Sequence, residues 1–390
     1  MAGGTCSVKA PRGPRWVTTS AALERPPFPR YCHKFVKIMP LQSRPGSPIA
    51  LAFVAIGAVA LLVYFAVAPP ESTEAERDGG APGSPPPVAA VHGPVAALAR
   101  PVGLDPERVA LGRRLFHDKR LSGDDTVACS SCHDLARGGV DGRSRAVGIR
   151  GQTGDMNTPT VYNAGLNFRQ FWDGRAADLV EQAAGPVHNP IEMDSNWPQV
   201  LSKLAGDAQY VAAFRRLYGR MDGPAIQDAI ATFERSLVTR DAPFDRHLQG
   251  DATALSADAA EGWQLFKSLG CVACHQGANL GGNMYAGLGV MGDFFRDRGH
   301  PPGKADLGRF NVTAREEDRH VFKVPGLRNV ARTGPYFHDG SVATLDEAVD
   351  LMAHYQLGIR LDQRRRGRLV AFLESLSGTL PPEAAKGENR

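Results

Sequence analysis

The chain has 390 residues, with 45 basic and 41 acidic side chains. This length allows two domains plus additional segments, and the nearly balanced charge excludes the strongly basic surface typical of nucleic-acid-binding proteins. Helix-forming residues dominate, and we expect a mainly α protein made of two tandem cytochrome c-like domains, preceded by one N-terminal membrane segment and a disordered linker.

Residues 1–47 are expected to be a cytoplasmic extension or, with Met39 as the true start, largely untranslated. The apolar run 48–68 is long enough to span a bilayer, and the basic residues before it orient its N-terminal side towards the cytoplasm. A cleaved signal and an uncleaved anchor both fit, and the prolines that follow favour the anchor. Residues 69–100, rich in Pro, Gly and Ala, read as a linker.

The first domain is expected at 101–245. Asp105 and Pro106 provide an N-cap and a first-turn proline for a helix that ends in a Gly-x-x-Leu-Phe element at Phe116. A Cys-x-x-Cys-His motif follows this element. The closing helix is predicted from apolar residues at helical spacing: Ile226, Ile230, Phe233 and Leu237.

The second domain, expected at 246–380, repeats this order and leaves 381–390 as a tail. Ser256 caps a helix that contains Gly-x-x-Leu-Phe ending at Phe266, and a second Cys-x-x-Cys-His motif follows. The closing helices of both halves contain Phe-x-x-Ser-Leu, which indicates an internal duplication. The apolar positions of the second closing helix are Leu369, Phe372, Leu373 and Leu376.

In a Cys-x-x-Cys-His motif, two thiols bond to the vinyl groups of one haem and the histidine becomes the proximal iron ligand. A paired zinc site or a disulfide is the alternative, but zinc ribbons hold their Cys pairs within about 20 residues of each other. The two pairs of this chain lie much farther apart. We therefore expect two covalent haem c groups, bound by Cys129, Cys132, His133, Cys271, Cys274 and His275.

The second axial ligand of each iron separates electron transfer from peroxide chemistry. For the second haem, Met352 lies shortly before the closing helix, where a cytochrome c places its methionine. The other candidates are Met284, Met291, His300, His320, His338 and His354. For the first haem, residues 134–160 contain no histidine and a single methionine, Met156, so its distal face is expected to be open.

Several longer motifs resemble the bacterial di-haem cytochrome c peroxidase family, which includes the MauG-type enzymes. The resemblance covers about 101–380. The motifs are Asn157-Thr-Pro-Thr-Val-Tyr-Asn163, Gln170-Phe-Trp-Asp-Gly-Arg-Ala176, Glu181-Gln-Ala-Ala-Gly-Pro-Val187, Ile191-Glu-Met193, Gly270-Cys-Val-Ala-Cys-His275, Asn279-Leu-Gly-Gly282, Phe322-Lys-Val-Pro-Gly-Leu-Arg-Asn329 and Gly334-Pro-Tyr-Phe-His-Asp-Gly340.

The resemblance implies a low-potential N-terminal haem that reacts with H2O2 and a high-potential C-terminal haem that collects electrons from a small donor, a cytochrome c or a cupredoxin. It implies that Gln182 and Glu192 line the distal pocket, with Glu192 as acid/base. Trp172 matches the tryptophan between the haems, and it is expected to carry the electron.

The resemblance also implies one calcium ion between the domains. Asn157 would give its side-chain oxygen, and Thr333 and Pro335 would give backbone carbonyls. A homodimer is implied by the family alone. The expected location is the periplasm, tethered to the inner membrane by the uncleaved segment.

One position departs from the family pattern. Many members carry a histidine in a Gly-His pair that caps the first iron, and here the pair is Gly148-Ile149. Isoleucine does not ligate iron, so the first haem is expected to be five-coordinate. We expect a cytochrome c peroxidase. The alternatives are a MauG-type oxidase that modifies tryptophans of a partner protein, which would have a tyrosine in place of Met352, and a non-enzymatic electron-transfer cytochrome.

Overall fold

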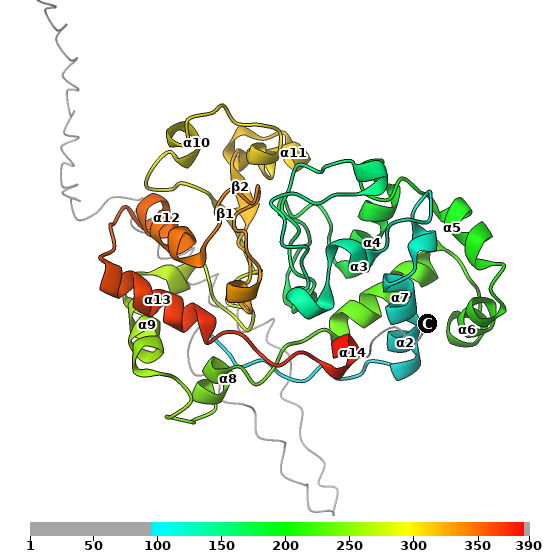
Figure 1. The fold of residues 1–390 in the computed structure, drawn as a ribbon, viewed down its shortest axis with the longest axis horizontal. Helices are drawn as coiled ribbons and strands as arrows, with labels where there is room; N and C mark the ends of the chain where they lie inside the picture. The colour runs from blue at the N-terminus through cyan, green and yellow to red at the C-terminus, as the bar shows by residue number, and fades with distance from the viewer. Residues whose placement is uncertain (1–94, 386–390) are drawn as a thin grey trace, which may run out of the picture. The chain divides into compact units, whose positions relative to one another are not determined.

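The computed structural model describes residues 95–385, so the predicted extension, membrane segment and most of the linker lie outside the described residues. The described part is mainly helical, which confirms the expected class (Figure 1). Its two strands, β1 (Tyr285–Gly287) and β2 (Val321–Lys323), form one antiparallel pair. None of the helices between residues 95 and 385 is long and apolar enough to cross a membrane.

Two sets of helices follow each other along the chain (Figure 1). The first set is α2 (Pro106–Phe116), α3 (Cys129–Cys132), α4 (Leu179–His188), α5 (Trp197–Leu204), α6 (Ala208–Tyr218) and α7 (Gly223–Ser236). The second set is α8 (Pro243–Leu248), α9 (Ala257–Ser268), α10 (Phe294–Asp297), α11 (Phe310–Thr313), α12 (Leu345–Leu357), α13 (Gln363–Glu374) and α14 (Pro382–Ala385).

The predicted caps begin the first long helix of each half. The Asp105 side chain accepts a hydrogen bond from the backbone of Glu107 at 2.8 Å, and Ser256 accepts one from Ala259 at 3.2 Å. These bonds satisfy backbone N–H groups that have no partner within the helix. Both helices therefore start where the sequence predicts.

The glycine of each Gly-x-x-Leu-Phe element lies where two helices cross. A Cβ atom on Gly112 of α2 would lie 1.9 Å from the carbonyl oxygen of Ala229 in α7, and one on Gly262 of α9 would lie 1.9 Å from that of Arg368 in α13. Only glycine permits this close approach. The same crossing therefore recurs in both halves, as expected for a duplicated unit.

Each crossing is part of a separate buried core. In the first half, Phe116 of α2 packs edge-on against Phe233 of α7, with ring centroids 5.3 Å apart. In the second half, Phe266 of α9 packs against Phe372 of α13 at 5.0 Å. The phenylalanines that the helical spacing predicted as core residues are thus buried in both halves.

The two ends of the described chain are exchanged between these cores. Val95, which precedes the first half, belongs to the core of the second half, and Leu98 beside it is also buried. Leu380 and Ala384, at the end of the second half, pack against the core around Phe116 in the first half. Figure 1 shows α14 beside α2 accordingly.

A buried ion pair holds the leading end in place. Arg328 lies 2.7 Å from Asp245, and both side chains are almost completely buried. Asp245 also accepts the backbone N–H of Leu98 at 3.1 Å, and Arg328 donates to the carbonyl of Ala96 at 3.0 Å. The leading segment is therefore bonded to the second half through this ion pair. Loss of either Arg328 or Asp245 alone would lower the stability strongly, because the other charge would remain buried without a partner.

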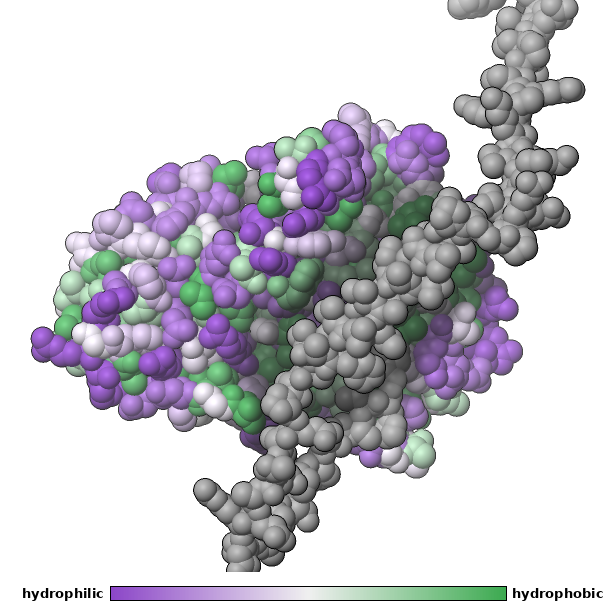
Figure 2. Space-filling view, turned by 180° about the vertical axis from the view of Figure 1, so that it is seen from behind, coloured by the Kyte–Doolittle hydropathy of each residue, from purple (hydrophilic) through white to green (hydrophobic). Residues whose placement is uncertain are grey.

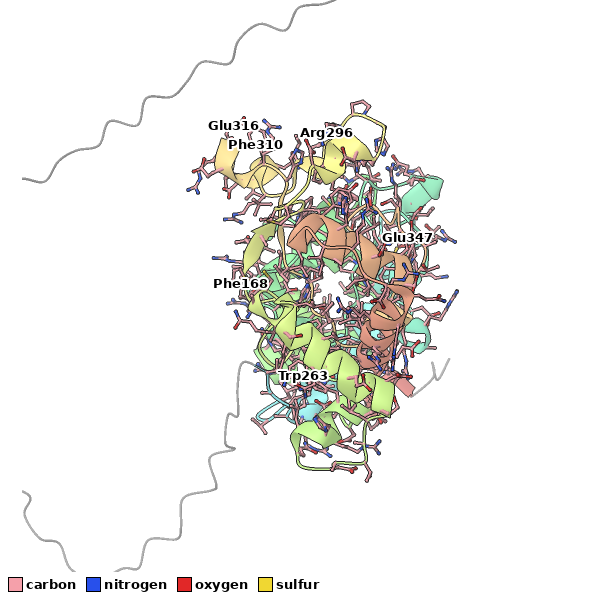
Figure 3. The ribbon with its side chains drawn as sticks, turned by 90° about the vertical axis from the view of Figure 1, so that its left-hand side faces the viewer. Phe168, Trp263, Arg296, Phe310, Glu316 and Glu347 are labelled. Atoms are coloured by element: carbon pink, nitrogen blue, oxygen red, sulfur yellow. The ribbon has the colours of Figure 1, made fainter. Side chains whose placement is uncertain are left out.

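The surface of the described residues is largely polar. Figure 2 shows hydrophilic residues over most of the visible face, with hydrophobic ones scattered among them. In Figure 3, Trp263 lies on α9 at one end of the second half, whereas Arg296, Phe310 and Glu316 lie at the opposite end, on the excursion that contains α10 and α11. This excursion separates the two short strands in sequence.

Candidate active site

The first Cys-x-x-Cys-His motif is arranged to hold a metal through its histidine. Cys129 and Cys132 lie on α3, and neither forms a disulfide. The Nδ1 atom of His133 lies 3.2 Å from the carbonyl oxygen of Gly139, which leaves Nε2 for a ligand bond. Burial lowers the pKa of His133, so the ring is neutral, as metal ligation requires.

The second motif repeats this arrangement at the wall of a cavity of about 410 Å³. The Nδ1 atom of His275 lies 3.2 Å from the carbonyl oxygen of Leu280, and burial lowers the pKa of His275. Cys271 and Cys274 are free thiols that line the cavity. Helices α9, α12 and α13 supply apolar wall residues, among which are Phe266, Ala353, Leu369 and Leu373.

The cavity favours one of the candidates for the second axial position. Met352 and His338 both line it. However, the Nε2 atom of His338 lies 2.7 Å from a carboxylate oxygen of Asp306 and is already engaged. Met291, which is 63% exposed, and His320 are not among the residues that line the cavity. This arrangement supports Met352, whose role as a ligand stays a prediction.

Glu192 lies in the loop after α4, close to the first motif. Asn189 donates to its carboxylate at 2.7 Å. Burial raises the pKa of Glu192 above 4.5, while the bond from Asn189 and the charge of Arg175 oppose the rise. Burial is the main cause of the raised pKa of Cys129 and Cys132, and the negative charge of Glu192 contributes to both. A carboxyl group with a raised pKa therefore adjoins the predicted first haem site.

The Gly148-Ile149 pair is bonded to this same loop. Ile149 is fully buried, and its N–H donates to the carbonyl of Glu192 at 2.8 Å. Arg150 forms an ion pair with Asp194 at 2.8 Å, and Gln152 donates to the carbonyl of Pro190 at 2.9 Å. The segment that would carry a capping histidine is thus fixed against the segment that carries Glu192.

Trp172 lies where the two halves meet. Its indole N–H donates to the carbonyl of Asn157 at 2.9 Å, and its own carbonyl accepts the N–H of Lys323 at 2.8 Å. The indole packs beside the aromatic cluster of Phe294, Phe295 and Phe322 and lines the 410 Å³ cavity. Trp172 is therefore bonded to both halves and adjoins the second haem site.

The predicted calcium ligands are three residues of the same cavity wall. Asn157, Thr333 and Pro335 all line the cavity. The Asn157 amide nitrogen donates to the carbonyl of Arg143 at 2.8 Å, which turns its oxygen away from that bond. No hydrogen bond within residues 95–385 uses the Asn157 side-chain oxygen or the carbonyl oxygens of Thr333 and Pro335. This donor set suits calcium.

Comparisons with known proteins agree with this geometry. A sequence model described as "Di-haem cytochrome c peroxidase" matches residues 106–253. Cytochrome c551 peroxidase of Nitrosomonas europaea is 42% identical over 296 residues, which cover 75% of this chain and 87% of that protein. The chain belongs to the di-haem cytochrome c peroxidase family. The family membership that the motifs indicated is confirmed.

Other members of the di-haem family agree with this assignment. Cytochrome c peroxidase Ccp of Escherichia coli (strain K12) is 49% identical over 291 residues, or 74% of this chain. The chain spans only 62% of the length of that protein. A crystal structure described as a MauG-like protein associated with microbial copper homeostasis superposes with a TM-score of 0.64 at 29% identity, covering 73% of this chain and 93% of that one. Two MauG proteins match at 36% and 33% identity.

Membership in the di-haem family implies two haem c groups, and the residues present fit them. Each site offers two free thiols and a neutral histidine whose Nδ1 is already bonded. The second site adds the apolar walls and a thioether. When bound, haem c supplies an iron that exchanges electrons and binds peroxide.

Some functional residues were not predicted. Arg175 pairs with Asp173 at 2.9 Å and stacks on the ring of Phe171 at 3.5 Å, and its charge lowers the pKa of Glu192. Asn189 is the hydrogen-bond partner of Glu192. The position of Arg175 within a quoted motif was the available signal for it, whereas Asn189 lies between two quoted motifs. Gln182 lies on α4 and is half-buried, and its expected role in the distal pocket stays a prediction.

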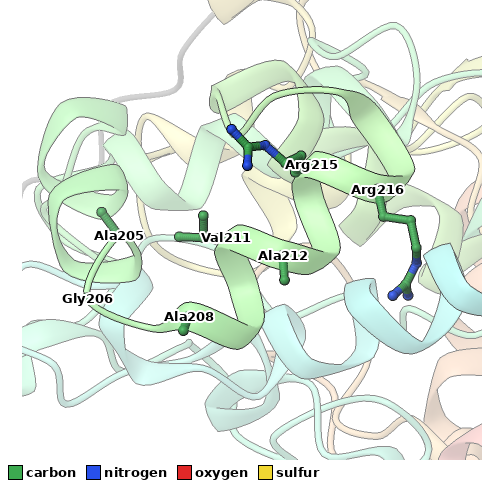
Figure 4. Close-up of a pocket in the computed structure, with 7 residues that line it drawn as sticks. All are labelled: Ala205, Gly206, Ala208, Val211, Ala212, Arg215 and Arg216. Atoms are coloured by element: carbon green, nitrogen blue, oxygen red, sulfur yellow. The ribbon is translucent and has the colours of Figure 1, made fainter.

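A second hollow lies away from this chemistry. It is formed by the end of α5 and by α6, measures about 650 Å³ and is open to solvent (Figure 4). Its walls are small apolar side chains together with Arg215 and Arg216. It contains none of the predicted site residues.

Proposed function

We propose that this chain is a cytochrome c peroxidase that reduces H2O2 to two waters with two protons and with one electron from each of two reduced donor molecules. The relatives named as cytochrome c peroxidases are 42–49% identical to it. The observation that carries the proposal is Glu192, a largely buried carboxyl with a raised pKa beside the first Cys-x-x-Cys-His motif.

Glu192 acts as the acid/base. In its ionised form it takes a proton from one oxygen of H2O2 and returns this proton to the other oxygen as the O–O bond breaks. A raised pKa brings the carboxyl closer to the working pH and makes both steps efficient. Asn189 holds one carboxylate oxygen at 2.7 Å, which orients the group, and Gln182 completes the distal pocket.

His133 would hold the first haem, and its iron would be five-coordinate in the oxidised enzyme and so able to bind peroxide. Ile149 occupies the position of the capping histidine and has no ligand atom. The bonds between the Ile149 segment and the Glu192 segment support a distal pocket that does not require rearrangement. Peroxide therefore reacts without prior reduction of the second haem.

Met352 and His275 would hold the second haem at a high potential, because thioether ligation favours the reduced iron, and electrons from the donor would enter there. They pass Trp172, which bonds to both halves. One Ca2+ held by Asn157, Thr333 and Pro335 fixes the geometry between the haems. The free oxygens at these three residues support this cation site.

The setting is the periplasm, where c-type haem attachment takes place. We propose that segment 48–68 anchors the enzyme to the inner membrane as an uncleaved helix, that the donor is a small cytochrome c or a cupredoxin, and that the enzyme is a homodimer. The apolar composition of segment 48–68 supports the anchor. The name cytochrome c551 peroxidase, which two relatives carry, supports a small cytochrome as the donor.

The deciding experiment adds H2O2 to the full-length holoenzyme with reduced cytochrome c. Catalytic oxidation of the donor is expected. A peroxide-induced change in the haem spectrum without donor turnover would favour the MauG-type oxidase. The observation that keeps this alternative is Ile149, which offers no ligand atom in the place of the capping histidine. No reaction would leave an electron-transfer cytochrome. An EPR spectrum of the oxidised protein in which the first haem is purely low-spin bis-His would refute five-coordination.

A further inference from the structure

Lys323 is a buried cation at the wall of the second haem site. It ends β2, where it pairs with Tyr285 of β1. The residue is 7% exposed, and it lines the 410 Å³ cavity together with Trp172 and Met352. Lysine is rarely buried to this degree without a partner for its charge.

No partner for this charge is present in the described part of the chain. The hydrogen bonds and ion pairs of residues 95–385 include none made by the Lys323 ammonium group, whereas the other buried cation of the same wall, Arg328, is paired with Asp245 at 2.7 Å. Burial lowers the pKa of Lys323 to about 8. The site therefore contains a positive charge that an anion in the cavity would satisfy.

The internal duplication identifies the residue of the first half that corresponds to Lys323. The segments 157–163 and 323–329 correspond, and they end in Asn163 and Asn329, which both have a positive φ near 60° and both donate to the hydroxyl of Thr239. Asn157 and Lys323 begin these segments. The N–H of Asn157 donates to the carbonyl of His338 and that of Lys323 to the carbonyl of Trp172, each at 2.8 Å.

His338 and Trp172 themselves occupy matching places in the motifs Tyr336-Phe-His-Asp-Gly340 and Gln170-Phe-Trp-Asp-Gly174. Lys323 is thus the counterpart, in the second half, of the predicted calcium ligand of the first half. The first half places the side-chain oxygen of Asn157, which suits a cation, where the two halves meet. The second half places the ammonium group of Lys323 at the corresponding position.

Haem c carries two propionates, which are the anions that occupation of this cavity would bring. We propose that the Lys323 ammonium forms the ion pair with a propionate of the second haem and thereby raises the reduction potential of that haem. The positive charge favours the reduced iron, which has one positive charge less than the oxidised iron. Lys323 is a positioning and charge-setting residue on the Trp172 side of the site.

The test is a spectroscopic redox titration of the holoenzyme, with Lys323→Met, Lys323→Arg and, as the control, Lys304→Met. Lys304 is an exposed lysine of the same half. In Lys323→Met the equilibrium constant for reduction of the second haem is expected to fall roughly tenfold, which equals about 59 mV for one electron. Lys323→Arg and Lys304→Met are expected to stay near the wild-type potential.

A Lys323→Met protein that carries both haems and titrates like Lys304→Met would overturn the proposal. If Lys323→Met does not retain both haems, a crystal structure of the wild-type holoenzyme decides: a Lys323 nitrogen farther than about 4 Å from every propionate oxygen of the second haem refutes the ion pair. The inference rests on haem binding and not on peroxidase turnover, so its failure and that of the proposed activity are separable.

Discussion

Replacing Gly262 by alanine tests whether the close helix crossing holds the second half together. The added Cβ would lie 1.9 Å from the carbonyl oxygen of Arg368 and 2.8 Å from Cβ of Phe372. Because both neighbours belong to α13, α9 and α13 would have to separate by about 1 Å, which loosens the contacts of Phe266 and Trp263 with Phe372. Overpacking of this kind costs about 3 kcal/mol at the upper end of its usual range.

For the folded unit that contains α9 and α13, a loss of about 3 kcal/mol in the free energy of unfolding lowers Tm by about 6–12 °C. Thermal unfolding of the holoprotein, followed by circular dichroism and by haem absorbance, measures it. The matched control is Gly367→Ala in α13, where an added Cβ meets nothing within 4 Å. That change should stabilise the helix by about 0.5–1 kcal/mol. If Gly262→Ala melted within 1 °C of the wild type, the reasoning from the crossing would be wrong.

Three further predictions concern single side chains. Glu192→Gln should slow peroxide cleavage by about 10²–10⁴-fold and remove the acidic limb of the pH–rate profile. In the wild type the midpoint of this limb should lie above pH 4.5, because burial raises the pKa of Glu192. Unchanged turnover would exclude Glu192 as the acid/base. Met352→His should lower the equilibrium constant for reduction of the second haem roughly a hundredfold, about 120 mV, and an unaltered titration would point to another ligand. Burial raises the pKa of Glu234 to about 8, so the folded protein favours the neutral carboxyl. The free energy of unfolding of the wild type should therefore fall by up to about 1.4 kcal/mol per pH unit between pH 4.5 and 8. Glu234→Gln should flatten this slope in thermal melts at pH 5 and pH 8.5, and equal slopes in the two proteins would contradict the assignment.

The helices and their duplication could be predicted from the sequence because their signals are local. Asp105 and Ser256 cap the helices that they were expected to cap, and the apolar spacing identifies Phe233 and Phe372 as core residues. The role of the Gly-x-x-Leu-Phe glycine could not be predicted in this way, since it depends on the partner helix. The residues that surround Gly112 and Gly262 in sequence do not show that glycine is needed at these positions. The need becomes evident only when the crossing helix is known.

The site depends more strongly on contacts between distant segments. Glu192 could be assigned only through family resemblance, because its burial arises from loops that share no periodic pattern and are joined by bonds such as that from Ile149. Lys323 and Glu234 were missed for the same reason: nothing in the neighbouring residues distinguishes a buried charge from an exposed one. The residue that corresponds to Glu234 in the duplicate is Leu373, an apolar residue that is buried.

The exchanged chain ends also bear on how the protein is made. Leu380 and Ala384 pack against the core of the first half, yet they are synthesised after the helices of the second half. The first half therefore acquires its final packing only after the second half has been synthesised. A fragment cut at the junction near residue 245 would lack these side chains, so neither half is a self-sufficient module that can be moved alone into another protein.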